Sequence, residues 1–374
     1  MNAFARTDTS ILGRWWWTVD RWSIAAIALL IAFGMMLTLA ASPPVADRLG
    51  YEPFHFVRRQ LGYLPLALAV LFGVSLMSPR GIRRLAIAGF LVALAALAAT
   101  FVFGAEVKGA RRWLNLGSVS IQPSEFIKPT FIVVTAWLFS MREGMAPEAG
   151  RNAAIALYAL VVGLLLLQPD VGMAVVVSAV WFTQFFIAGL PLAWVGAFIA
   201  LGLAGAVGAY FALPHVASRV DRFLDPSSGD TYQVMRSMEA FMNGGALGRG
   251  PGEGTVKAVL PDAHTDFIFA VAAEEFGLFA CLIIAGLFAF VVLRGISRVM
   301  QDSSLFVMLA ATGLLVQFGL QALINMASTL RLMPTKGMTL PFISYGGSSL
   351  VAVAFGVGMV LALTRRRVGQ EGAV

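Results

Sequence analysis

Mostly apolar stretches of about twenty residues recur along this chain of 374 residues, and they restrict what it can fold into. A helix of about 20 residues crosses the hydrocarbon core of a bilayer. In lipid, backbone amides are satisfied only within helices or closed barrels, and the alternating pattern of a membrane barrel is absent. Charged residues make up 13% of the chain, whereas soluble domains carry about 25%. These features predict an all-α polytopic membrane protein.

Ten segments are long and apolar enough to be transmembrane helices, and together they predict a single transmembrane domain over residues 1–374. An even number of spans puts both termini on one side of the membrane, with a long outward loop between helices seven and eight. The first apolar stretch has no convincing cleavage site after it, so we expect it to be retained as a span. The predicted spans are residues 22–41, 61–77, 85–103, 124–141, 153–167, 171–190, 192–213, 267–293, 305–328 and 343–363.

The distribution of Lys and Arg predicts the orientation, because cytoplasmic loops are enriched in both. Of 27 such residues, 13 lie on the side of the termini, 13 lie on the other side, and Lys128 lies inside a span. The long loop, residues 214–266, holds five of the second set, and long loops carry little weight in this rule. We therefore expect residues 1–21 and 365–374 to be cytoplasmic and residues 214–266 to be periplasmic. The surplus of outward cations indicates an anionic ligand there, or attraction to lipid headgroups.

A first polar cluster surrounds the start of the fourth span. Lys108, Arg111 and Arg112 precede it, and they can bind a phosphate or pyrophosphate through charge-assisted hydrogen bonds. Glu125 and Lys128 follow inside the span, on one face of the expected helix. Charges within a span usually face a cavity or a partner. The two side chains therefore line a polar cavity or form a structural ion pair that locks two helices.

Asp170 lies in a very short turn, residues 168–170, between the fifth and sixth spans. It can cap the following helix at its N-terminus. It can equally be a buried carboxylate that pairs with a cation near the first cluster. Both roles remain open from the sequence.

The long loop contains two further features. A glycine-rich segment, residues 244–254, lacks the context of a dinucleotide-binding loop and can form a mobile loop over a substrate. Before it, apolar residues recur with helical spacing, which suits packing, a membrane surface or a lipid tail. This apolar stripe consists of Val234, Met235, Met238, Phe241 and Met242.

Asp266 is the leading candidate for a catalytic residue, because it lies where an outward loop enters the eighth span. Partial desolvation raises the pKa of a carboxylate there toward a value that suits a general base. Its alternative role is to cap the helix that follows. His264 is a rival base with a more suitable unperturbed pKa. Glu274 lies about 80° round the expected helix from Asp266 and about 12 Å further along it, deeper in the span. With Glu275 beside it, at least one of the two should face a polar partner.

Lys336 is a further candidate phosphate contact, in a Pro- and Gly-rich segment, residues 332–349, before the last span. The single cysteine, Cys281, excludes an intrachain disulfide and a cysteine metal cluster. The three histidines are scattered, which argues against a histidine metal site.

Five of these segments, in this order along the chain, resemble the signatures of the SEDS family (shape, elongation, division and sporulation). They are residues 108–113, 122–128, 168–170, 260–277 and 334–349. Residues 12–22, 230–233, 244–254 and 261–266 are more similar to the division member of this family than to its elongation member. The resemblance implies a peptidoglycan glycosyltransferase that joins lipid II units with inversion, while undecaprenyl pyrophosphate leaves.

The resemblance also implies roles for individual residues. Asp266 matches the essential aspartate of the family and is therefore preferred to His264 as the base. Glu125, Lys128 and Asp170 match charged cavity residues, and we group His264 and Glu274 with them as substrate-binding candidates. Many relatives carry a basic residue at the position of Ser120, so the cation that pairs with Asp170 must here be another residue or be missing. The pyrophosphate needs cations, which can come from Arg59, Lys108, Arg112 and Lys336.

The family further implies a bacterial inner-membrane protein at the division septum. Its expected partners are lipid II, membrane lipids, a class b penicillin-binding transpeptidase and other division proteins, but no nucleic acid. A two-phosphate ligand makes Mg²⁺ a candidate cofactor, although no dedicated ligand cage is visible in the sequence. Three other functions compete: a lipid II flippase, a scaffold that only recruits a transpeptidase, and the same polymerase acting in elongation.

Overall fold

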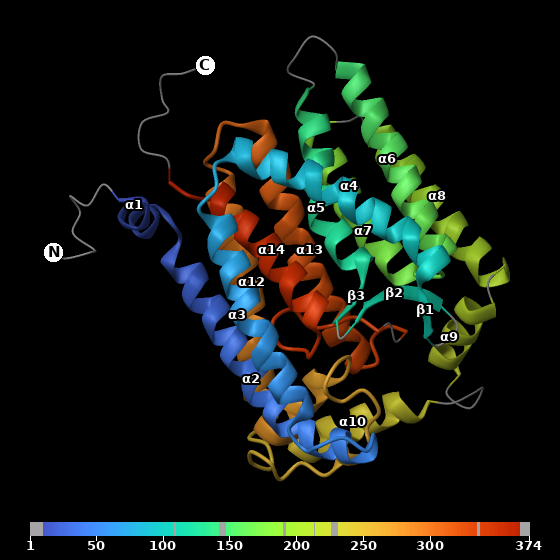
Figure 1. The fold of residues 1–374 in the computed structure, drawn as a ribbon. Helices are drawn as coiled ribbons and strands as arrows, with labels where there is room; N and C mark the ends of the chain where they lie inside the picture. The colour runs from blue at the N-terminus through green and yellow to red at the C-terminus, as the bar shows by residue number, and fades with distance from the viewer. Residues whose placement is uncertain are drawn as a thin grey trace.

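The computed structural model describes residues 10–107, 110–117, 119–141, 147–189, 192–212, 214–225, 231–334 and 337–366. Long helices dominate these residues and run roughly side by side (Figure 1). The short helix α1 (Ile11–Thr18) lies at the end of the molecule where the last helix finishes. The amide of Arg366 donates to the carbonyl of Thr18 at 3.1 Å. The two extremities of the described chain therefore meet at one end of the bundle.

Each of the ten predicted spans falls on a helix in the described part of the chain. Six of these helices, α2, α3, α4, α6, α12 and α13, are long and apolar enough to cross a membrane. The helical membrane fold is thereby confirmed, while the count of ten spans stays a prediction. The ten helices are α2 (Arg21–Arg48), α3 (His55–Ser75), α4 (Pro79–Phe103), α5 (Pro123–Ser140), α6 (Pro147–Leu167), α7 (Val171–Ile187), α8 (Leu192–Ala212), α12 (Ile268–Val299), α13 (Leu305–Thr329) and α14 (Gly347–Leu363).

The connections contain more regular structure than the sequence indicated. The long loop between α8 and α12 contains three helices, α9 (Pro214–Leu224), α10 (Tyr232–Gly244) and α11 (Val256–Val259). Between α4 and α5 lies a three-stranded antiparallel sheet, in the order β1 (Ala105–Val107), β2 (Ala110–Leu116) and β3 (Val119–Ile121). The turn after β2 contains Gly117 at a φ of 65°, a left-handed conformation that favours glycine. We did not predict these strands.

The apolar interior forms two clusters. One involves α4, α5, α6, α7 and α13, and the other involves α2, α3, α12 and α14. Because lipid tails are as apolar as these side chains, close backbone contact matters more here than the hydrophobic effect. A methyl group at Gly34 would lie 2.2 Å from the Phe342 carbonyl oxygen, and one at Gly358 would lie 2.8 Å from the Leu71 carbonyl oxygen. These two glycines let α2 and α14 approach their neighbours closely.

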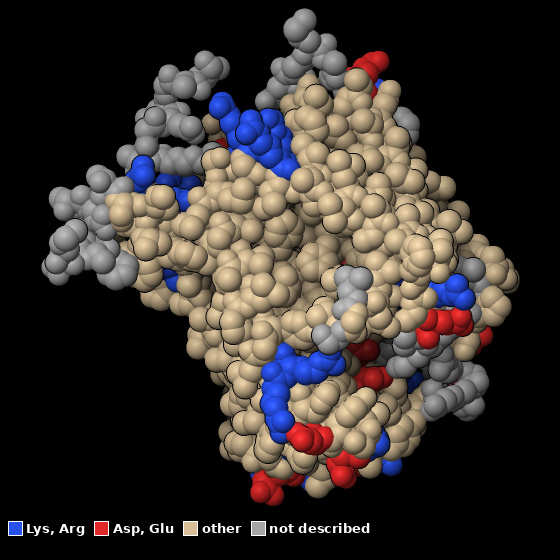
Figure 2. Space-filling view, in the orientation of Figure 1, with Lys and Arg blue, Asp and Glu red and all other residues tan. Residues whose placement is uncertain are grey.

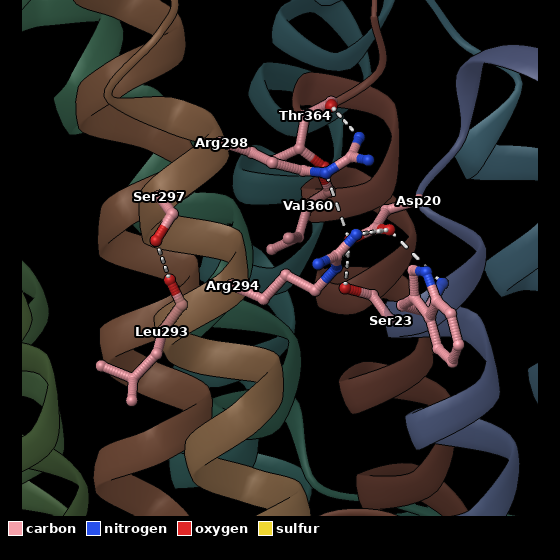
Figure 3. Close-up of polar contacts among 9 residues, drawn as sticks. Asp20, Ser23, Leu293, Arg294, Ser297, Arg298, Val360 and Thr364 are labelled. Atoms are coloured by element: carbon pink, nitrogen blue, oxygen red, sulfur yellow. Dashed lines mark hydrogen bonds and ion pairs between the residues drawn. The ribbon is translucent and has the colours of Figure 1, made fainter.

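Asp20 joins three helices at the end of the bundle that carries α1 (Figure 3). Its side chain caps α2 and accepts a hydrogen bond from Ser23 Oγ at 2.9 Å. Arg294 of α12 donates to both oxygens, at 2.6 and 3.0 Å. Arg298 Nε lies 3.2 Å from Oδ2, and its Nη1 donates to the Thr364 carbonyl after α14. Burial opposes the charge of Asp20, but these hydrogen bonds and positive charges outweigh it and lower its pKa.

The helix α12 is interrupted at Gly277, whose φ of 74° and ψ of −173° are not helical. The glycine-rich segment occupies this break. The amides of Arg249 and Gly250 donate to the carbonyls of Glu274 and Glu275, while the amides of Leu278 and Phe279 donate to those of Gly245 and Ala246. The segment thus supplies partners for helix groups that the break would leave without one. We expected a mobile loop over a substrate, but residues 245–250 are bonded into α12.

Candidate active site

Asp266 ends a tight turn that leads into α12. The amides of Thr265 and Phe267 donate to the Asp262 carbonyl at 3.1 and 3.3 Å, and Asp262 adopts a φ of 55°. Aspartate tolerates this left-handed conformation better than most residues. The helix begins at Ile268 with Phe267 as its N-cap. Asp266 lies one residue before that position, so it is not the N-cap residue that its alternative role required.

The turn is held from two sides by other segments. From α13, Asn325 Nδ2 donates to the Asp266 carbonyl at 2.9 Å and to the Met338 carbonyl at 2.6 Å. From the segment before α14, Ser344 Oγ donates to the Thr265 carbonyl at 2.6 Å, and the Tyr345 amide donates to the His264 carbonyl at 2.9 Å. These bonds fix the backbone from which the Asp266 carboxylate projects.

The Asp266 side chain is partly exposed and lies against Gly337. A methyl group added at Gly337 would stand 3.0 Å from Asp266 Oδ2, closer than ordinary van der Waals contact. The absence of a side chain at Gly337 therefore leaves room beside the carboxylate. A partly exposed carboxylate on a fixed backbone has the geometry of a general base.

His264 is buried, with 7% of its surface exposed. Its ring packs against Phe56 and Tyr345, with centroids 4.3 and 5.4 Å away. Burial lowers the pKa of His264 to about 4, with Asp262 opposing this shift and Arg48 adding to it. The imidazole is therefore neutral near neutral pH, and it is a weak base. His264 was a rival to Asp266 because its unperturbed pKa suits a general base, and burial removes that advantage.

Arg59 of α3 hydrogen-bonds to Tyr345, which follows the turn-holding Ser344. The predicted phosphate contact Arg59 thus lies beside the segment that holds the Asp266 turn. Figure 2 shows basic side chains gathered over this lower end of α2 and α3.

Glu125 and Lys128 form a buried ion pair of 3.0 Å within a closed ring of polar contacts. Lys128 donates to Gln321 at 2.9 Å, and Gln321 Nε2 donates to the Thr339 carbonyl at 3.1 Å. The hydroxyls of Thr339 and Ser349 lie 2.6 Å apart, and Ser349 donates back to Glu125 at 3.4 Å. This polar ring joins α5, α13 and α14. The pair has the helix-locking geometry that was one of its two predicted roles.

Arg112 of β2 pairs with the turn that contains Asp170. Arg112 donates to the carbonyls of Gln168 and Pro169 at 3.2 and 2.6 Å, and its Nε lies 3.8 Å from Asp170 Oδ2. Asp170 also caps α7 by accepting from the Met173 amide at 3.4 Å. Because position 120 holds a serine and not a basic residue, the cation that pairs with Asp170 in this chain is Arg112. Both roles considered for Asp170, the cap and the buried partner of a cation, are present together.

Glu274 is fully buried, and backbone amides bind its carboxylate. Its Oε1 accepts from the amides of Thr255 and Val256 at 2.9 and 3.0 Å, so it caps the short helix α11. Glu275 forms a buried ion pair with Lys257. Both carboxylates have polar partners, as expected, while a substrate-binding role of Glu274 stays a prediction. A carboxylate within a span needed a partner, and backbone amides provide it.

Two predicted phosphate contacts fall outside the described structure, and two polar residues near the site were not predicted. Lys108 and Lys336 lie outside the described residues. Within the described residues, no three His, Cys, Asp or Glu side chains are close enough together to hold a metal ion. Sequence reasoning missed Gln321 and Asn325, although Gln317, Gln321 and Asn325 recur every fourth residue in an apolar span. That spacing puts three amides on one helix face, and it was the available signal.

Comparisons with known proteins agree with this architecture. A sequence model of the family described as "Cell cycle protein", which covers FtsW, RodA and SpoVE, matches residues 21–368. The probable peptidoglycan glycosyltransferase FtsW of Caulobacter vibrioides is 47% identical, over 100% of this chain and 96% of that protein. The protein of the same name from Coxiella burnetii is 36% identical, over 93% and 96%.

Solved structures show the same fold. One is a chain from work on the structural coordination of polymerization and crosslinking by a peptidoglycan synthase complex, with a TM-score of 0.76 and 30% identity over 92% of this chain and 97% of that one. Another is the rod shape determining protein RodA of Thermus thermophilus, with a TM-score of 0.69 and 29% identity over 93% and 97%. The chain therefore belongs to the cell cycle protein family of FtsW, RodA and SpoVE, as its resemblance to SEDS proteins indicated.

Proposed function

We propose that this chain is a peptidoglycan glycosyltransferase that polymerises lipid II during cell division. The names of its relatives support both the activity and the division role. The observation that carries the proposal is the partly exposed Asp266 carboxylate, on a turn fixed by Asn325 and by the segment before α14. A partly exposed carboxylate can accept a proton from a hydroxyl that reaches it from outside the bundle, which supports the proposal.

In the proposed reaction, Asp266 takes the proton of the 4-hydroxyl of the acceptor sugar. The hydroxyl oxygen forms a bond to the anomeric carbon of the donor, on the face opposite the leaving group. The bond from that carbon to the pyrophosphate oxygen breaks, and undecaprenyl pyrophosphate leaves with the bonding electrons. One proton moves to Asp266 and one glycosidic bond replaces one phosphoester bond, with inversion at the anomeric carbon.

The leaving pyrophosphate needs positive charge beside it. Arg59 supports this role, because it lies beside Tyr345 and the segment that holds the Asp266 turn. We retain Lys108 and Lys336 as further proposed contacts. Arg112 is a weaker candidate, since its guanidinium already donates to the turn at Asp170.

The proposed setting is the bacterial inner membrane at the division septum. Both termini are cytoplasmic in this proposal, and the end that carries Asp266 and α10 faces the periplasm. The proposed partners are a class b penicillin-binding transpeptidase, further division proteins and membrane lipids. A need for Mg²⁺ is a separate prediction, tested by polymer formation with and without EDTA, and no step above depends on it.

The decisive experiment gives labelled lipid II to the purified protein with its transpeptidase partner, and separates glycan polymer on a gel. We expect Asp266→Asn to reduce polymer by roughly 100-fold or more, because a general base contributes about 10²–10⁴-fold. The control is Asp302→Asn, at the opposite end of the bundle, which should polymerise like the parent. Equal polymer from Asp266→Asn and the parent would refute the proposal. Lipid translocation in vesicles that persists in Asp266→Asn, without polymer, would favour a flippase instead.

A further inference from the structure

A cavity of about 1320 Å³ opens at the end of the bundle opposite the Asp266 turn. The start of α4, the end of α12, the start of α13 and the end of α14 form its walls. Figure 2 shows a cluster of basic side chains at this end, over the beginning of α4. Three segments far apart in the sequence thus bring their cations to one hollow, which we call the arginine basin.

Six arginines and a single acidic residue, Asp302, line the arginine basin. Asp20 neutralises part of this charge by pairing with Arg294 and Arg298 (Figure 3). In the described part of the chain, no carboxylate forms an ion pair with Arg80, Arg83 or Arg366. The six arginines are Arg80, Arg83, Arg294, Arg298, Arg365 and Arg366.

The basin also has an apolar side. Phe290 and Leu293 line it from α12 and are 41% and 65% exposed, so they form part of the outer surface of the bundle. Arg83 lies over the ring of Trp137, 5.5 Å from its centroid, which fixes its guanidinium at the wall. The N-terminus of α13 at Ser304 also opens into the basin and adds partial positive charge. A ligand that fits this hollow carries negative charge next to an apolar portion.

Topology alone explains an excess of Lys and Arg at this end, but not their convergence on one hollow. Arg84 illustrates the difference, because it belongs to the same turn of α4 as Arg80 and Arg83 yet does not line the basin. Basic pockets between membrane helices on the cytoplasmic side bind phosphate-bearing lipid headgroups. Guanidinium groups suit phosphate because their donors match its oxygens in pairs.

We propose that the arginine basin binds the headgroup of an anionic phospholipid, with the phosphate among the arginines and the acyl chains along Phe290 and Leu293. This site goes beyond the proposed function, because it lies at the other end of the bundle from Asp266. It anchors the junction of α2, α12 and α14 to lipid of the leaflet on that side. A lipid with two phosphates, such as cardiolipin, matches the charge best.

The test uses the purified full-length protein in nanodiscs and native mass spectrometry to count bound lipids. Phosphatidylglycerol, cardiolipin and phosphatidylcholine are titrated in parallel. We expect cardiolipin to bind most tightly and phosphatidylcholine not to be retained. The double variant Arg80→Gln/Arg366→Gln should weaken cardiolipin binding roughly 30-fold, at about fivefold for each cation removed. Arg84→Gln is the matched control, and it should bind cardiolipin like the parent.

Equal retention of phosphatidylcholine and cardiolipin would overturn the proposal, as would an Arg84→Gln variant that loses as much binding as the double variant. A second experiment measures whether inorganic pyrophosphate competes with cardiolipin for the arginine basin. If it displaces cardiolipin at equal concentration, the ligand is a soluble phosphate compound and the lipid assignment fails. Thermal unfolding in phosphatidylcholine shows whether the double variant is folded. Cardiolipin binding by Asp266→Asn should equal that of the parent, so failure here and failure of the proposed function are distinguishable.

Discussion

The carbonyls of Asp266 and Met338 share one donor, the Nδ2 of Asn325, whose side chain is 1% exposed. Through this single amide, α13 aligns the turn before α12 with the segment before α14. These two hydrogen bonds reach backbone carbonyls and not the Asp266 carboxylate or a proposed phosphate contact. It is therefore a positioning residue, and its removal should be felt at Asp266 through the backbone.

Asn325→Ala should lower polymer formation and stability together. The buried Met338 carbonyl and the partly buried Asp266 carbonyl lose their donor, and an unsatisfied buried polar group costs about 1–3 kcal/mol. Asn325→Asp keeps the size but replaces the donor with an acceptor, so it should be no better. Asn152→Ala, on the exposed face of α6, is the control. Thermal unfolding and the lipid II assay measure the two effects, and parent-like behaviour of Asn325→Ala would show that the shared bond is unimportant.

Gly337→Ala should reduce polymer formation while leaving the fold intact. The new methyl group would stand 3.0 Å from Asp266 Oδ2, and either the carboxylate or the segment must shift. A displacement of about 1 Å at a reacting group can cost up to about 100-fold in rate. Gly62→Ala meets nothing within 4 Å and serves as the control. A Gly337→Ala protein with the parent's rate would mean that the carboxylate works from another position.

His264 should make stability depend on pH below neutrality. Its pKa is lowered from 6.5 to about 4 in the fold, so the unfolded chain binds a proton first as the pH falls. The stability due to neutral His264 is complete above about pH 6.5 and is lost toward about pH 4, by roughly 3 kcal/mol in all. Unfolding midpoints at several pH values should show this slope, and His264→Gln should flatten it. An unchanged slope in His264→Gln would assign the effect to other groups.

At this scale, the sequence predicted Asp266 correctly as a loop residue at the mouth of α12, and it missed the residues that hold it. The motif points to Asp266 because a general base at this place would have to be a titratable side chain, and such residues are rare beside a span. Asn325 lies 59 residues from Asp266 and 13 from Met338 in sequence, and its bonds to their carbonyls depend on the packing of three segments. The partners of Glu274, the amides of Thr255 and Val256 at the start of α11, were hidden from the sequence for the same reason.

Among the elements, α12 combines a break at Gly277 with charged contacts on both sides of it. Before the break, Glu275 pairs with Lys257, which also donates to the Gly252 carbonyl at 2.9 Å. The pair is almost fully buried, with 8% and 0% of the two side chains exposed. Burial of this kind makes the loss of one partner costly, because the other charge is left without compensation.

Lys257→Met should lower the free energy of unfolding by about 3–5 kcal/mol, because Glu275 stays buried with its charge. The double variant Lys257→Met/Glu275→Met should recover much of this loss, since no buried charge remains. Arg58→Met, which removes the exposed ion pair with Glu52, should change stability by less than about 1 kcal/mol. Thermal unfolding in detergent measures all three. If the double variant were as unstable as Lys257→Met, packing rather than charge would explain the effect.

The ten apolar helices were predictable because an apolar segment in lipid must satisfy its own backbone amides, and a helix does so. The three strands between α4 and α5 were not, since they lie outside the apolar segments and are only three to seven residues long. The helical content of the long loop was only partly visible. The stripe over Val234–Met242 indicated a helix, but Met235 and Met242 are 62% and 80% exposed, whereas Ser237 and Ala240 are buried. The helix packs through small residues, which an apolar pattern does not reveal.

For the whole molecule, the contacts of α12 determine how it can move. Glu275 pairs with Lys257 near one end, and Arg294 pairs with Asp20 near the other. Sliding the helix by one turn, about 5.4 Å, would separate both pairs at once. Piston-like travel is thereby disfavoured, and rotation about the non-helical Gly277 is the remaining freedom. A conformational change transmitted along α12 between the two faces of the membrane would therefore tilt one part of the helix relative to the other. It would not move the helix along the membrane normal.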